Sequence, residues 1–94
     1  AYSPAVALAS GENPADGVRT LGSRLAILKL KDFAHGKPVP AGEGDAQLAA
    51  ATRAARDRGF DGWGVVEIDH LWLKGAAGDP AEALRRSAAH VYGW

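Results

Sequence analysis

The feature that most constrains the fold is an apolar segment, residues 25–30, that ends abruptly in charged side chains. Buried strands of parallel sheets read as nearly continuous apolar runs, so this segment is predicted to be a core strand. Because side chains alternate between the faces of a strand, Lys29 and Lys31 share one face. Unpaired lysines are costly to bury, and ligands of α/β folds bind where the strands end. The chemistry is therefore predicted to lie near Lys29, Lys31 and Asp32.

The segment before this strand is predicted to form a first strand–helix unit. Residues 2–8 read as a short strand, although Pro4 lacks the amide hydrogen that a central strand needs. Asn13 followed by Pro14 is typical of a helix start, with Asn13 as the N-cap. Gly22 predicts the end of this helix, because glycine readily adopts the left-handed conformation found there.

The apolar strand opens the second unit. Residues 34–44 are rich in Gly and Pro and are predicted to form a loop. Asp45 is expected to cap an alanine-rich helix that ends near Arg58. Gly59 would then supply the left-handed residue after this helix, and Phe60 could pack back on its last turn.

The third unit repeats the same order. Its strand is predicted over residues 63–68 and is followed by a loop through Gly75 and Gly78. Asp79 and Pro80 repeat the cap-then-proline signal of the first helix and predict the start of a final helix.

The predicted fold class is α/β, with three consecutive parallel βα units. Three parallel strands leave two open edges and an uncovered face, which a free-standing domain would have to protect. A closed (β/α)8 barrel takes about 250 residues, more than are present here. Residues 1–94 are therefore expected to be the C-terminal part of a TIM barrel. The absence of Met at the first position is in keeping with a piece of a longer or processed protein.

Composition argues against several classes of function. The chain has 11 basic and 11 acidic residues and a formal net charge of +0, unlike a nucleic-acid binder with its basic surface. No apolar run approaches the roughly 20 residues that cross a bilayer, and no signal peptide is visible. The lack of Cys excludes disulfides and thiolate metal sites and fits a reducing compartment. We therefore expect a cytoplasmic protein with neither nucleic acid nor membrane as partner.

Short motifs follow one another in an informative order. Lys-Asp at residues 31–32 closes the apolar strand, and a Pro-x-Gly-x-Gly loop follows at residues 40–44. Gly-Phe-Asp-Gly at residues 59–62 leads into a strand that ends near Glu67, and Gly-Asp-Pro at residues 78–80 precedes the last helix. This order resembles the C-terminal part of the sugar phosphate isomerase/epimerase family, the xylose isomerase-like TIM barrels.

The resemblance implies isomerisation, epimerisation or dehydration of a sugar or polyol by proton transfer next to a carbonyl. Such enzymes hold a divalent metal ion, for example Mn²⁺ or Mg²⁺, which polarises substrate oxygens while acidic residues move protons. By the resemblance, Glu67 is a catalytic residue and metal ligand, and Lys31 is a catalytic residue that orients substrate oxygens. Lys29, however, stands at the position of the family's metal-binding histidine, and residues 3–6 lack its Asp-x-x-His pattern. Only Glu67 is then left as a metal ligand.

Lys29 suggests an alternative to a metal site. A protonated lysine donates hydrogen bonds and cannot ligate a metal ion. If Lys29 and Glu67 lie on neighbouring strands and face the barrel axis, they could form an ion pair near the family's metal position. The intact protein would then be a non-catalytic sugar-binding or structural homologue that has lost its metal site. A third interpretation is an independent α/β module that completes its sheet by oligomerising.

The other site candidates surround the same strand ends. The predicted substrate-binding residues are Lys29, Asp32, Asp69, His70 and Trp72. Trp72 is the best candidate for stacking on a sugar face. Structural interpretations stay open beside these: lysines that extend to solvent, Asp32 as a turn former, and a solvated His70. The expected partners are a small-molecule sugar or polyol and the rest of the barrel or a second copy, so this chain alone is expected to be inactive.

Overall fold

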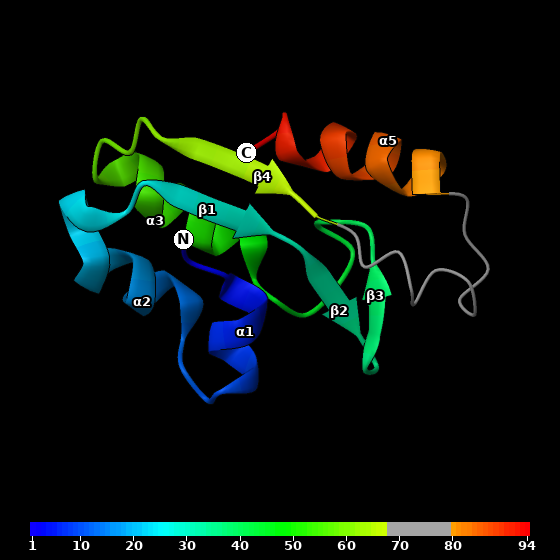
Figure 1. Cartoon of the computed structure of the whole chain (residues 1–94), viewed down its shortest axis with the longest axis horizontal. Coiled ribbons are helices and arrows are strands. Elements are labelled where there is room, and N and C mark those ends of the chain that lie inside the picture. The colour runs from blue at the N-terminus through cyan, green and yellow to red at the C-terminus, as the bar shows by residue number, and fades with distance from the viewer. Residues whose placement is uncertain (68–79) are drawn as a thin grey trace.

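The computed structural model describes residues 1–67 and 80–94 and has a mixed α/β fold with a small parallel sheet (Figure 1). Strands β1 (Ile27–Leu30) and β4 (Trp63–Val66) pair in parallel, with Ile27 opposite Trp63. Tyr2 forms a parallel bridge to Leu28 on the other edge of β1. The strand order in space thus follows the order along the chain.

Helices cover one face of this sheet. Helix α2 (Pro14–Leu21) packs against α3 (Leu48–Asp57), and α3 lies behind the two strands in Figure 1. Leu28 and Leu30 point toward these helices and are almost fully buried in the same apolar core. The alternate residues of β1 are only partly buried, so the opposite face of the sheet is open in the described part of the chain. The alternation of faces predicted from the sequence is confirmed.

The predicted strand over residues 2–8 is wrong, because this segment forms helix α1 (Pro4–Ala9). The Ser3 side chain caps the helix by accepting a hydrogen bond from the Val6 N–H (3.4 Å). Proline in the first helical turn loses no hydrogen bond, whereas it would interrupt a sheet ladder. Of the predicted strand, only Tyr2 makes a bridge to the sheet.

The predicted loop over residues 34–44 also contains regular structure. Strands β2 (Asp32–Ala34) and β3 (Lys37–Val39) form an antiparallel hairpin. His35 (φ 54°) and Gly36 (φ 75°) both adopt the left-handed conformation at its turn. A two-residue turn with two positive φ angles matches the twist of a hairpin, and this tertiary pairing replaces the expected loop.

The predicted helix ends are partly confirmed. Asn13 caps α2 by accepting a hydrogen bond from the Asp16 N–H (3.2 Å), and Gly22 ends it with φ 53°. Asp45 does not cap α3, because that helix begins three residues later, at Leu48. Gly59 follows α3 with φ 76°, as predicted.

The third unit is described in part. Strand β4 covers residues 63–66 of the predicted strand, and α5 (Pro80–Val91) follows as the predicted final helix. Figure 1 shows α5 alongside β4 and running in the opposite direction. The loop through Gly75 and Gly78, and the Asp79 cap, lie outside the described residues. Within the described ranges, no helix has the length and hydropathy needed to cross a membrane.

Candidate functional site

An ion pair links the carboxyl ends of the two parallel strands. Lys29 Nζ lies 3.5 Å from Glu67 Oε1, and the two side chains are 41% and 35% exposed. The strand register explains why these two side chains are in contact. Lys29 is opposite Val65, and Glu67 lies two residues further along on the same face as Val65. The Glu67 N–H donates to the Leu30 carbonyl oxygen (3.2 Å), which extends the pairing to this residue. The ion pair suggested by the sequence is therefore present.

This pair adds little to stability, because ion pairs open to solvent contribute only about 0–1 kcal/mol. Its position at the carboxyl ends of the strands is more relevant to function than to stability. A carboxylate and an ammonium group on one open face can exchange protons with a ligand or hold its oxygens.

A metal ion fits the described residues poorly. Glu67 has the Lys29 ammonium group beside it, and that positive charge opposes a second cation. No group of three His, Cys, Asp or Glu side chains that could hold a metal ion is found in residues 1–67 and 80–94. Asp69, His70 and Trp72 lie outside these ranges, so their predicted contacts with substrate stay predictions.

Asp32 organises the loop beside the strand end. Its carboxylate is buried, at 3% exposure, and accepts four backbone N–H groups. Oδ1 accepts from Phe33 (3.0 Å) and Ala46 (2.9 Å). Oδ2 accepts from Gly42 (3.0 Å) and Gly44 (3.1 Å). The Pro-x-Gly-x-Gly motif is thus wrapped around a carboxylate, and these contacts give Asp32 a structural role beside its predicted one.

Glycine is required at position 44 of this loop. A Cβ on Gly44 would lie 2.4 Å from the Phe33 carbonyl oxygen and 2.5 Å from Asp32 Oδ1. Both atoms belong to the hydrogen-bonded turn, so neither can move away without breaking it. The motif therefore reflects close backbone packing around Asp32.

Helix α5 is attached to the same loop by polar contacts that the sequence did not reveal. Ser87 is fully buried, and its hydroxyl accepts a hydrogen bond from the Ala41 N–H (2.9 Å). Glu43 accepts a hydrogen bond from Arg86 Nε (2.9 Å) and lies 3.3 Å from His90 Nε2. These partners are more than 40 positions apart in the sequence, and no local signal connects them.

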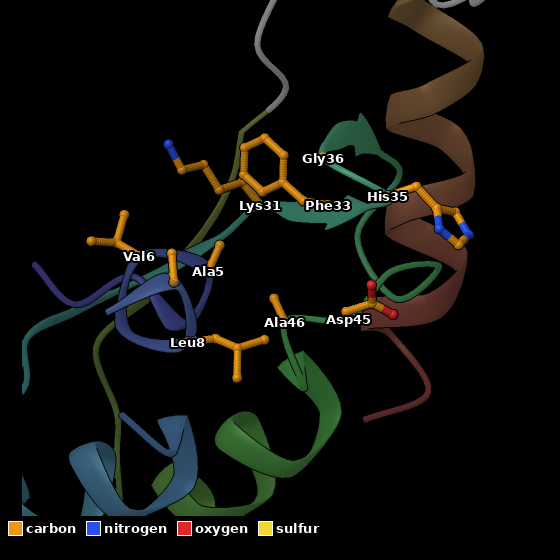
Figure 2. Close-up of a pocket in the computed structure, with 10 residues that line it drawn as sticks. Ala5, Val6, Leu8, Lys31, Phe33, His35, Gly36, Asp45 and Ala46 are labelled. Carbon is orange, nitrogen blue, oxygen red and sulfur yellow. The ribbon is translucent and has the colours of Figure 1, made fainter. Parts of the chain in front are cut away.

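A cavity of about 450 Å³ opens between α1 and the hairpin, and Figure 2 shows its lining. Most of the wall is apolar and includes Val6, Leu8 and Phe33. The Lys31 ammonium group lies 5.8 Å from the centre of the Phe33 ring. Asp45 and His35 line the cavity as well. Lys31 follows the last residue of β1 and thus faces a different environment from Lys29, which lies within the strand.

Tyr2 has an altered acidity at the edge of the sheet. Burial raises the pKa of its phenol from 10.0 to about 12, helped by the hydrogen bond to Glu12 and by the negative charge of that carboxylate. The phenol oxygen lies 2.8 Å from Glu12 Oε1. Ionised Tyr2 would thus be partly withdrawn from solvent and next to a like charge.

Alkaline unfolding should report this shift. Below pH 10.0 the Tyr2 phenol is protonated in both states, so its contribution to stability is complete. As the pH rises from 10.0 to about 12, only the unfolded state loses the proton, and this contribution is lost. The free energy of unfolding should therefore fall between pH 10.0 and about 12, and we expect this fall to be smaller in Tyr2→Phe. Urea titration at several pH values measures it. Tyr92→Phe, at a residue that is 91% exposed, is the control and should keep it.

Comparison with known proteins does not place the chain in a family: no family model matches it, and no curated protein or solved structure is significantly similar. The functional argument therefore rests on the motifs and on the geometry around Lys29, Glu67, Lys31 and Asp32. Of these, the structure brings Lys29 and Glu67 together, places Lys31 at the cavity and buries Asp32 in the loop.

Proposed function

We propose that this chain is the C-terminal part of a (β/α)8 barrel of the sugar phosphate isomerase/epimerase type. The intact protein would act on a small sugar or polyol by moving a proton next to a carbonyl group. The observation that carries the proposal is the Lys29–Glu67 pair at the carboxyl ends of adjacent parallel strands, the end where barrel enzymes bind substrate.

The open face of the sheet supports the barrel. Trp63 is 76% exposed and Val65 is 39% exposed, although both belong to a strand beside the core. A parallel sheet with helices on one face and apolar side chains on the other is expected to be buried on both faces. In a barrel, the inward face is covered by the remaining strands. The parallel order Tyr2, β1, β4 agrees with consecutive barrel strands.

The ion pair suggests how the chemistry proceeds. As general base, the Glu67 carboxylate takes a proton from the carbon next to the substrate carbonyl. The Lys29 ammonium group, 3.5 Å from that carboxylate, donates a hydrogen bond to the oxygen on which negative charge develops. Lys31, which follows the last residue of β1, would orient further substrate oxygens. No step of this proposal uses a metal ion.

Substitution of Glu67 tests the proposal. The protein, purified at its natural length without chelator, is incubated in deuterated water with a panel of aldoses, ketoses and polyols. Exchange of carbon-bound hydrogen is followed by NMR. We expect Glu67→Gln to reduce exchange by about 10²–10⁴-fold, the usual contribution of a general base. Glu82→Gln, at an exposed residue of α5 that pairs with Arg85, is the matched control and should leave exchange unchanged.

Unchanged exchange in Glu67→Gln would contradict the assigned base. A second candidate is a non-catalytic sugar-binding homologue, favoured by Lys29 at the position of the family's metal-binding histidine. Its signature is sugar binding without exchange in the unaltered protein, with binding weakened by Glu67→Gln. Metal analysis of the same sample, before and after the substitution, shows whether Glu67 holds a divalent ion despite Lys29.

A further inference from the structure

The cavity between α1 and the hairpin has the character of a ligand site. Its volume of about 450 Å³ lies within the range of small-molecule pockets, roughly 300–1,000 Å³. Apolar side chains of α1 form one wall, among them Val6 and Leu8, and the Phe33 ring forms part of another. Such a wall favours a ligand with an apolar body.

The charge at this cavity is asymmetric. Lys29 is neutralised by Glu67, whereas Lys31 has no carboxylate within ion-pair distance in the described part of the chain. Its ammonium group lies 5.8 Å from the centre of the Phe33 ring, a contact that positions the charge without neutralising it. An uncompensated cation beside an apolar wall attracts an anionic group.

Asp45, which also lines the cavity, does not neutralise Lys31. Figure 2 shows Lys31 with Val6 on one side of the opening, and Asp45 with His35 on the other. The Asp45 carboxylate points away from Lys31 in this view. It would repel an anion on its own side, so the anionic end of a ligand is directed toward Lys31.

We propose that this cavity binds a small organic anion, with its carboxylate or phosphate on Lys31 and its apolar body against Phe33 and α1. Lys31 is also the residue proposed to orient substrate oxygens, but the site does not rest on that function, because it requires no proton transfer at Glu67 and is tested by binding alone.

The test is a titration of the protein with simple probes, followed by calorimetry and by ¹H–¹⁵N NMR shifts. Benzoate and phenyl phosphate carry the two anionic groups on an apolar ring, benzyl alcohol is the neutral analogue, and inorganic phosphate lacks the ring. We expect both ring anions to bind about tenfold or more tightly than benzyl alcohol, as hydrogen bonds to a charged group permit. The shifts should map to α1 and the hairpin. The tighter of the two anions identifies the preferred headgroup.

Lys31→Gln should remove this preference and leave the affinity for benzyl alcohol unchanged. Lys37→Gln, at an exposed lysine of the hairpin outside the cavity lining, is the matched control and should change the affinities by less than about twofold. Lys31→Arg keeps the positive charge and should keep the preference for anions. This variant shows that a loss in Lys31→Gln comes from the missing charge and not from a folding defect. Equal affinity for anion and alcohol, an undiminished preference in Lys31→Gln, shifts elsewhere on the chain, or no binding of the ring probes would each overturn the proposal.

Discussion

Replacement of Asp32 by Ala is expected to lower the free energy of unfolding by about 3 kcal/mol or more. The carboxylate is 3% exposed and accepts four backbone N–H groups. Alanine would leave these four donors without this partner; the Ala46 hydrogen bond is buried and the other three are partly buried. An unpaired buried donor costs about 1–3 kcal/mol before relaxation. Urea denaturation followed by circular dichroism measures the loss.

Two further variants sharpen this test. Asp32→Asn keeps one acceptor oxygen but turns an amide NH₂ toward backbone donors, so we expect a smaller but clear loss. Asp61→Ala removes an exposed carboxylate and should change the free energy of unfolding by less than about 0.5 kcal/mol. A loss in Asp32→Ala no larger than in this control would mean that Asp32 does not hold the loop.

Replacement of Leu28 by Ala should have an effect of similar size. Leu28 is 1% exposed in β1 and belongs to the cluster that joins the sheet to α2 and α3. Removal of its branched end leaves a cavity that the packed helices cannot fill, and such changes cost about 2–5 kcal/mol. Thermal or urea unfolding measures the change.

Leu84→Ala is the matched control, because Leu84 is 46% exposed on α5 and alanine favours a helix. We expect a loss of less than about 1 kcal/mol there. If the two leucine variants lost the same stability, the face assignment of β1 would be wrong.

The parts of the fold that sequence reasoning predicted have short-range causes. The apolar run of β1, the Asn-Pro start of α2 and the glycine after α3 each involve neighbours within a few residues. Strand β1 is shorter than predicted by two residues at its start. The prediction failed in residues 2–8, where the Ser-Pro cap outweighed the apolar pattern, and in the hairpin, where pairing of distant backbone groups replaced a loop.

The candidate site likewise has features that the sequence predicts and features that depend on the fold. Lys29, Lys31 and Asp32 could be singled out because charge follows an apolar strand. The partner of Lys29 could be proposed from the family motif, and the parallel register then brings Glu67 to it. The four donors to Asp32 could not be predicted, because they come from a loop whose path depends on the folded chain.

The sequence by itself determined the apolar faces, the caps of α2 and the position of charge at the strand end, since these follow from periodicity and from local hydrogen bonds. The tertiary structure alone decided how each charged group is used. Lys29 is neutralised because β4 lies beside β1, and Lys31 is left with an apolar cavity because α1 is a helix rather than a strand. Asp32 is buried because the glycine loop folds back over it. Contacts between distant segments depend on packing, which no local pattern encodes.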